Sequence, residues 1–461
     1  CINGLLDKAP MEEVQDKIME FCEEDLEQQL HFIDMSFAAK TSSSKKDSTG
    51  MCFATYCHIP RVTPAKWLDL ATNIGELIIQ RSISAGSEDL KEITWIDTIL
   101  EGREEVTWSL APVGNDLYNG NGGIALFLGY LGAIAGRKHF SQAAYQAIRV
   151  LQRAIEAVNV SHPYTIGAFN GLSGFFYTLS KLCSINHNAE VASFIKKYLK
   201  HWAGLLEKDK LFDVVGGSAG SLGVLLSMEQ TVPGIDNREL FNMITTTYRH
   251  IAKSGRESPL GVSWGLGNMA YSGFAHGNAG IAAYLAKYYA RTGDKSALSS
   301  IEEALKLERA LYSPEHKNWF PSLAKDRISH GWCHGAPGIL LSKLIIAQYD
   351  YGDDFLKQEL NVALETTVAK SFGYNTSLCH GDLGNLTILN YAAKILKDDN
   401  LGNRCTETFQ DLFENVLLHR WNQGLFRGAE SMGLMVGLAG IGYALLRQCE
   451  PDFVPEILIL E

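Results

Sequence analysis

A Gly-x-x-Gly motif followed by an apolar run occurs seven times in this chain, and it constrains the fold more than any other feature. Successive first glycines lie 51, 46, 60, 58, 46 and 56 residues apart. This loose period is typical of repeats built from two helices. The sequence therefore predicts seven structural repeats, whose glycine pairs are Gly120/Gly123, Gly171/Gly174, Gly217/Gly220, Gly277/Gly280, Gly335/Gly338, Gly381/Gly384 and Gly437/Gly440.

A second, outer helix is expected between successive motifs. After the first motif, Phe140, Ala144, Ile148, Leu151 and Ile155 recur at steps of three or four residues, which indicates one buried helix face. Glycine suits a loop that turns into a crowded inner helix, because it reaches unusual backbone conformations and lets backbones approach closely. The alternation predicts an all-α fold, a closed α/α toroid of seven helical hairpins. An open α-solenoid would show the same periodicity and stays an alternative.

Composition narrows the class of protein. With 46% hydrophobic residues, the 461-residue chain can bury a large core, and no apolar run reaches the ~18 residues of a membrane-spanning helix. No signal-peptide pattern is present, so we expect a cytoplasmic protein without a transmembrane segment. The net charge of −11, with both signs interspersed, argues against a nucleic-acid surface. Nine scattered cysteines, an odd number, favour reduced thiols over a disulfide framework.

The organisation of the sequence changes near residue 105. Residues 1–105 lack the glycine repeat and contain helical patterns at 11–37 and 64–84, with a polar stretch at 41–50 typical of a flexible loop. We therefore expect residues 1–105 to be the end of an upstream domain plus a connector, and residues 106–461 to be the repeat domain. Because the chain starts with Cys1 rather than methionine, we expect it to be part of a longer polypeptide.

Cysteine and histidine are concentrated at one place in the repeat. When the repeats are aligned on their first glycine, the two preceding positions hold Cys or His five times in fourteen, as His276, Cys333, His334, Cys379 and His380. In a ring, equivalent positions lie at equivalent heights, so these side chains should converge. Thiolates and imidazoles are the ligands that zinc prefers. A metal-bound active site is the leading interpretation, although a lone cysteine or histidine is usually a core residue.

The segments around these positions resemble the lanthionine cyclases, the LanC-like proteins. The matching stretches are Trp-Cys-His-Gly-Ala-Pro-Gly-Ile at 332–339, Leu-Cys-His-Gly at 378–381 and Ser-Gly-Phe-Ala-His-Gly at 272–277. Residues 25–29, 94–96, 117–120, 124–127 and 166–169 are similar to class II lanthipeptide synthetases (LanM), in which a dehydratase domain precedes the cyclase domain. The resemblance covers all seven repeats, and it implies that residues 1–105 are the C-terminal end of a dehydratase-type domain plus a connector.

The resemblance implies roles for five residues. Cys333, Cys379 and His380 match the family's zinc ligands, and the fourth position is left for the substrate cysteine. His276 matches the catalytic histidine and Asp213 the catalytic aspartate. Periodicity alone leaves His380 and His334 equivalent as ligands, and an ordinary turn or helix-cap aspartate stays an alternative for Asp213.

Two further positions depart from the family pattern. His334 stands where stand-alone cyclases often carry tyrosine, so we expect it among the catalytic residues with its role open. Arg327, six residues before Cys333, is the nearest candidate for an arginine that stand-alone cyclases place before the first zinc cysteine.

The implied reaction joins a peptide cysteine thiol to the β-carbon of a dehydroalanine or dehydrobutyrine and closes a lanthionine or methyllanthionine ring, as in lantibiotic biosynthesis. A free thiol with pKa near ~8.5 is mostly protonated at neutral pH, and coordination to Zn2+ deprotonates it. His276 is the expected general acid at the α-carbon, because the unperturbed pKa of histidine is near ~6.5. Asp213 would orient His276 and stabilise its charged form, or it would accept the thiol proton on entry.

The resemblance also implies partners, and three other functions remain open. The expected partners are a dehydrated precursor peptide, the dehydratase domain of the same polypeptide and a peptide exporter. The alternatives are a LanC-like enzyme that adds glutathione to dehydrated proteins, a non-catalytic toroid that binds peptides, and a zinc hydrolase that activates water.

Overall fold

The computed structural model describes residues 9–19, 21–41, 63–87, 90–101, 107–157, 165–265, 270–349, 354–419, 423, 425 and 429–461. They belong to two compact units, Cys1–Lys45 with Ile96–Pro112 and Leu425–Ala429, and Lys46–Trp95 with Val113–Gly424 and Glu430–Glu461. No helix within these ranges is both long and apolar enough to cross a membrane. The polar stretch expected to be a flexible loop falls mostly on residues 42–50, outside the described residues.

The smaller unit consists of two helices and a hairpin. They are α1 (Pro10–Met19), α2 (Glu23–Thr41), β3 (Ile96–Glu101) and β4 (Thr107–Pro112). The strands pair antiparallel with Ile96 opposite Pro112, and α2 packs against the hairpin. The helical pattern at 11–37 is therefore confirmed as two helices.

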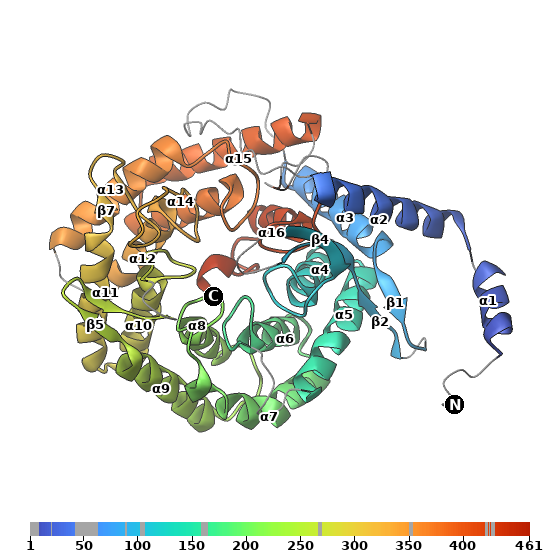
Figure 1. The fold of residues 1–461 in the computed structure, drawn as a ribbon, viewed down its shortest axis with the longest axis horizontal. Coiled ribbons are helices and arrows are strands. Elements are labelled where there is room, and N and C mark those ends of the chain that lie inside the picture. The colour runs from blue at the N-terminus through green and yellow to red at the C-terminus, as the bar shows by residue number, and fades with distance from the viewer. Residues whose placement is uncertain are drawn as a thin grey trace. The chain divides into compact units, whose positions relative to one another are not determined.

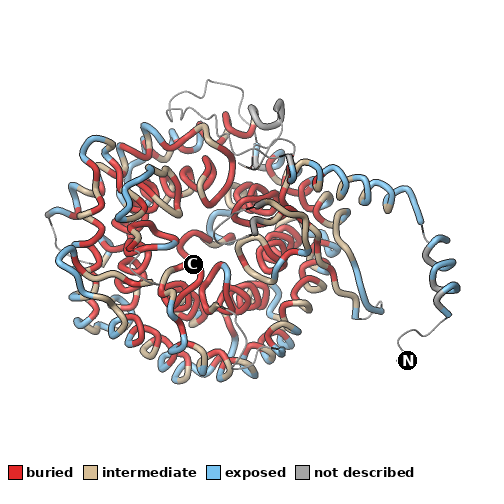
Figure 2. The backbone as a smooth tube through the Cα atoms, viewed as in Figure 1, coloured by how far each residue is buried: buried red, intermediate tan, exposed pale blue. Residues whose placement is uncertain are grey.

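Seven apolar helices form the inner layer of the larger unit. Each begins directly after the first glycine of a motif, and most of its residues are buried, as the tube in Figure 2 shows. The seven helices are α4 (Asn121–Ala135), α6 (Leu172–Asn186), α8 (Ser218–Met228), α10 (Asn278–Thr292), α12 (Ala336–Ala347), α14 (Asp382–Leu396) and α16 (Leu438–Cys449).

Seven amphipathic helices surround them, as Figure 1 shows for this unit. Six follow their inner partners in the chain, and α3 packs against α16 as the outer helix of the seventh pair. α3 lies before the expected boundary near residue 105, and that boundary stays a prediction. The outer helices are α3 (Pro64–Gln80), α5 (Lys138–Ala157), α7 (Ala189–Ala203), α9 (Asn237–Ser254), α11 (Ser296–Ala310), α13 (Asp354–Lys370) and α15 (Asp399–His419).

Three short antiparallel hairpins are added to this helical ring. They are β1 (Ile83–Ala85) with β2 (Glu92–Thr94), β5 (Arg256–Ser258) with β6 (Gly261–Ser263), and β7 (Tyr312–Ser313) with β8 (Asn318–Trp319). The first hairpin has Ile83 opposite Thr94. The predicted all-α toroid of helical hairpins is confirmed, with these hairpins as local additions.

A circuit of backbone hydrogen bonds closes the inner ring. In every repeat, the residue two before the first glycine donates its N–H to the carbonyl of the equivalent residue in the next repeat, at 2.7–3.4 Å. The seventh bond runs from Met435 N to Tyr118 O at 2.7 Å and joins the last repeat to the first. An open solenoid has no such final bond, so the ring is closed. The circuit passes through Tyr118, Phe169, Val215, Ala275, Cys333, Cys379 and Met435.

The second glycine of each motif is explained by close backbone approach. A Cβ at Gly440 would lie 1.9 Å from Leu434 O, and the other six second glycines meet the corresponding carbonyl at 1.9–2.4 Å. Among the motif glycines, Gly335 alone has a positive φ, +99°. Of the two reasons expected for glycine, contact between loop and helix backbones therefore dominates, because no side chain fits at that separation.

The C-terminal segment lies in the centre of the ring. Residues 457–460 are buried, and Figure 1 places the C-terminus in the middle of the ring. Tyr177 donates to Glu461 O at 3.0 Å, Lys287 to Ile459 O at 2.8 Å and Trp332 to Leu458 O at 3.2 Å. Side chains of three inner helices or their loops thus anchor this segment.

We predict that Gly440→Ala destabilises the protein by about 3–5 kcal/mol, because the added methyl collides with a backbone carbonyl in a closed ring. Gly402→Ala is the matched control: its Cβ would meet nothing nearer than 3.8 Å within α15. That variant should gain about 0.5–1 kcal/mol. Chemical denaturation of both proteins tests the pair, and an equal stability change at the two positions would contradict the close-approach explanation.

Candidate active site

The loops that precede the inner helices place the predicted site residues at one end of the ring. Cys333, Cys379 and Ala275 are members of the hydrogen-bonded circuit, and their neighbours His334, His380 and His276 precede the first glycines. Equivalent positions of repeats four, five and six are therefore held side by side. The convergence expected from the register of the motif is what the structure shows.

Two thiols and an imidazole form a cluster of possible metal ligands at this end of the ring. The ligand atoms of Cys333, Cys379 and His380 all lie within 4.8 Å of one another. Cys379 is buried, and the other two side chains are partly buried. This arrangement could hold a metal ion, and His334 is outside it. The six cysteines among the described residues are free thiols.

The two thiols have opposite acidities. A hydrogen bond from Cys379 lowers the pKa of Cys333 to about 7, against the effect of burial, and the positive charge of His276 and the N–H of His334 contribute. The same bond, burial and the charge of Cys333 raise the pKa of Cys379 well above its usual value. Cys333 is therefore the thiolate of the pair and Cys379 the donor.

Tyr118 is a neighbour of the cluster that the sequence analysis did not single out. Its hydroxyl donates to the Cys379 sulfur. Burial and the negative charges of Cys379 and Cys333 raise the pKa of Tyr118 far above its ordinary value, so the hydroxyl keeps its proton. Tyr118 occupies the same position in repeat one as the two cysteines in repeats five and six. This shared position in the repeat is the sequence feature that could have identified Tyr118 as a site residue.

Asp213 and His276 form a hydrogen-bonded pair between neighbouring repeats. His276 Nδ1 lies 2.9 Å from Asp213 Oδ2, and Gly216 N donates to Asp213 Oδ1 at 2.7 Å. The His276 side chain is 43% exposed and that of Asp213 16%. Burial alone would lower the pKa of His276, but the hydrogen bond and charge of Asp213, with the charge of Cys333, raise it. The acceptor at Nδ1 directs Nε2 away from Asp213.

His334 lies beside this pair rather than among the possible metal ligands Cys333, Cys379 and His380. Its ring is nearly parallel to that of His276, with centroids 5.7 Å apart and an interplanar angle of 29°. Burial lowers the pKa of His334 to about 3, helped by the positive charges of His276 and Arg327. Arg327 is exposed in the loop before Cys333. His334 is thus a neutral imidazole near neutral pH.

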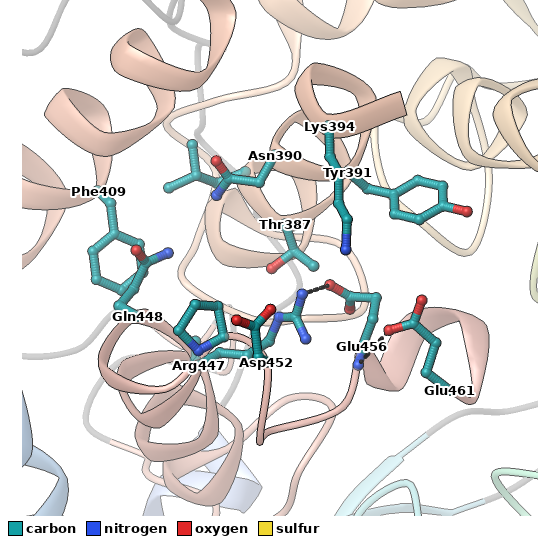
Figure 3. Close-up of a pocket in the computed structure, with 13 residues that line it drawn as sticks. Thr387, Asn390, Tyr391, Lys394, Phe409, Arg447, Gln448, Asp452, Glu456 and Glu461 are labelled. Carbon is teal, nitrogen blue, oxygen red and sulfur yellow. Dashed lines mark hydrogen bonds and ion pairs between the residues drawn. The ribbon is translucent and has the colours of Figure 1, made fainter. Parts of the chain in front are cut away.

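Aromatic side chains fill the ring directly beneath the site. Trp332 is fully buried, and its ring packs edge-on against Phe169 at 5.0 Å and tilted against Phe274 at 5.9 Å. A cavity of about 300 Å³ lies elsewhere, between the C-terminal halves of α14 and α16. Figure 3 shows its polar lining, in which Arg447 pairs with Glu456 at 3.2 Å. The possible metal ligands lie in the loops before the N-termini of the inner helices, so this cavity lies at the opposite end of the ring.

Known proteins resemble this chain in fold and in sequence. A solved structure of nisin cyclase matches with a TM-score of 0.62 and 16% identity, covering 75% of this chain and 91% of that one, which shows a shared fold. The lacticin 481/lactococcin biosynthesis protein LcnDR2 of Lactococcus lactis subsp. lactis is 26% identical over 455 residues. The match covers 94% of this chain but 45% of that relative, so the chain spans about half of its length. The family model described as lanthionine synthetase C-like protein matches residues 111–459, and the chain belongs to this family.

Proposed function

We propose that this chain is a zinc-dependent cyclase that forms lanthionine and methyllanthionine rings in a dehydrated precursor peptide. The observation that carries the proposal is the placement of Cys333, Cys379 and His380 beside the hydrogen-bonded pair Asp213–His276. One group of side chains can hold a metal, and the other can move a proton. Membership in the family and the similarity to a lacticin 481/lactococcin biosynthesis protein support this proposal.

The donor set suits zinc. Ligands at ~2.0–2.3 Å from a tetrahedral zinc lie roughly 3.5–3.8 Å from one another, which agrees with ligand atoms that are all within 4.8 Å. Two sulfurs and one imidazole favour a soft or borderline cation over magnesium or calcium. When bound, zinc would lower the pKa of a substrate cysteine at the remaining position and keep its sulfur nucleophilic.

His276 supplies the proton that the reaction needs. The substrate sulfur bonds to the β-carbon, the C=C π electrons move to the α-carbon and its carbonyl, and the enolate then takes a proton at the α-carbon. The raised pKa of His276 favours the protonated imidazole, which can donate that proton. Asp213 holds the ring through Nδ1, so Nε2 would be the atom that delivers the proton. The proton lost by the thiol balances the proton gained by carbon.

His334 and the partners complete the proposal. A neutral imidazole next to His276 can hydrogen-bond to the substrate carbonyl without competing for the proton, and this is the role we assign to His334.

The partners and the location remain predictions: a dehydrated precursor peptide, a dehydratase domain in a longer polypeptide, a peptide exporter and the cytoplasm. Arg327, exposed near His334, is positioned to meet an acidic or carbonyl group of the peptide.

Thiol consumption tests the function. Incubating the metal-loaded chain with a dehydrated precursor that contains cysteine should remove free thiols while the peptide mass stays constant, because the addition is intramolecular. His276→Asn should slow thiol loss by about 10²–10⁴-fold, the usual contribution of a general acid. Addition of glutathione would appear as a mass increase. A toroid that only binds peptides, or a hydrolase, would leave the thiol count unchanged, and that result would refute the proposal.

Metal content tests the ligands. The wild-type chain should bind about one zinc, and Cys333→Ala or Cys379→Ala should reduce this to about a tenth or less, because two donors cannot complete the site. Cys183→Ala is the control, since Cys183 is a buried free thiol in α6 away from the cluster. His276→Asn should keep its zinc. Zinc that remains stoichiometric after both ligand cysteines are replaced would show that the assignment is wrong.

The pKa of His276 tests the hydrogen-bonded pair Asp213–His276. We predict that Asp213→Asn lowers the pKa of His276, measured by NMR of the imidazole protons in the metal-free chain. Because the folded pKa is raised, the Asp213 interaction stabilises the protein fully below the unfolded pKa near ~6.5, and this contribution disappears as the pH rises through the folded value. The substitution should therefore destabilise the protein most in mild acid. Glu229→Gln, which breaks the surface pair with Arg291, should leave the pKa of His276 unchanged.

A further inference from the structure

Seven loops lead into the seven inner helices, and the third of them, before α8, departs from the other six at one peptide bond. In those six loops, the carbonyl oxygen six residues before the first glycine lies 1.8–2.6 Å from where a Cβ of that glycine would stand. At Gly217 the nearest atom is Phe212 N, at 2.3 Å. Phe212 has φ +61°, and none of the six equivalent residues has a positive φ. The peptide between Leu211 and Phe212 is therefore turned over.

Asp209 compensates for the turned peptide. In five of the other loops, the first helical N–H donates to the carbonyl that is turned away in the third loop. Here the Asp209 carboxylate replaces that carbonyl: its Oδ2 accepts from Ser218 N at 2.7 Å and from Phe212 N at 2.9 Å. Its Oδ1 accepts from Leu211 N at 2.9 Å. The loop is thus held by a side chain where the repeat normally uses its backbone.

His250 supports this loop from the outer layer. It lies on α9 and is 5% exposed, with Nε2 2.9 Å from Asp209 O. Its ring packs against Phe212, with centroids 5.1 Å apart and an angle of 35°. Because a left-handed backbone is unfavourable for a bulky residue, it persists only where the surroundings hold it. Asp209 and His250 are those surroundings.

The residue that follows the turned peptide is Asp213, and repeat one offers an internal comparison. Asp116 stands at the same position of a loop without the turned peptide, and its Oδ1 accepts from both Asn119 N and Gly120 N, at 2.8 and 3.2 Å. Asp116 therefore serves its own loop. Asp213 gives one oxygen to Gly216 N and directs the other to His276 of the next repeat.

We propose that the turned Leu211–Phe212 peptide is a positioning device that aims Asp213 at His276, with Asp209 and His250 as its supports. Phe212 and His250 are positioning residues, because they act through Asp213. This inference rests on the proposed function where it concerns the rate of ring formation. The part that concerns the Asp213–His276 hydrogen bond is independent of the reaction.

The test compares Phe212→Gly with Phe212→Ala in the 461-residue chain. Both remove the ring, but glycine adopts φ +61° freely and alanine does not. We expect Phe212→Gly to keep kcat within about 3-fold of wild type and Phe212→Ala to lose about 10-fold or more, with KM for the dehydrated peptide unchanged in both. A residue that only fills space would give the reverse order, since alanine retains more of the side chain.

Lys397 provides the matched control. It caps α14 with φ +55° at the opposite end of that helix from the metal cluster. Lys397→Gly and Lys397→Ala should differ in thermal stability as the Phe212 pair does, with equal kcat. A difference in kcat at Lys397 of the same size would overturn the proposal, because it would reduce the effect at Phe212 to general stability.

NMR of histidine-labelled, metal-free protein provides a second readout. The downfield Nδ1 proton signal of His276, which reports the bond to Asp213, should persist in Phe212→Gly and weaken in Phe212→Ala. If this order appears but no thioether forms, the positioning device stands and the proposed function fails. Equal signals in the two variants would overturn the device.

The His250 pair decides the matter if neither Phe212 variant folds. His250→Gln keeps a donor for Asp209 O, whereas His250→Leu does not. We expect His250→Leu to weaken the His276 signal and His250→Gln to restore most of it. Thr247→Val, one turn earlier on α9 with its hydroxyl bonded to Met243 O, should match wild type. An unchanged His276 signal in folded His250→Leu would contradict the proposed support.

Discussion

The closed circuit of seven backbone hydrogen bonds is the constraint on which the rest of this structure depends. Each bond is worth only about 0.5–1.5 kcal/mol net, yet together they fix the height of every loop around the ring. Cys333 and Cys379 are 46 residues apart in the chain and are joined directly by one of these bonds. Side chains on adjacent circuit residues start from neighbouring backbones. A cluster of possible metal ligands can therefore be assembled from separate repeats without any local motif such as a zinc finger.

Glycine makes this circuit possible in a specific way. The second glycine of each motif lets the loop carbonyl press against the first turn of the inner helix, at a separation that excludes a Cβ. The loop therefore lies flat on the helix end, and its next residue can reach the neighbouring loop. Gly335, a first glycine, is the one motif glycine that needs a positive φ, at +99°. At this loop the first helical N–H donates to the Asn318 side chain instead of a backbone carbonyl.

The periodic motif was sufficient to predict the seven helical hairpins and, for a ring, the meeting of their Cys and His residues. It left an open solenoid possible, and the bond from Met435 N to Tyr118 O is what shows closure. It could not separate His334 from His380, since the two occupy equivalent positions. The structure separates them: His380 joins the cysteines, whereas His334 stacks on His276 in the loop with the unusual Gly335 backbone. The place of α3 was also hidden, because it carries no glycine motif and its partner α16 is more than 350 residues away.

The chemistry of the two thiols explains why this end of the ring suits a cation. Cys333 and Cys379 lie side by side and share one proton: ionisation of Cys333, with a pKa of about 7, raises the pKa of Cys379. Tyr118 and His276 place a donor and a positive charge near the sulfurs, but neither removes this conflict. A divalent cation does, because it stabilises both thiolates at once. The symmetric scaffold therefore offers a candidate metal site where two thiols of like charge lie side by side.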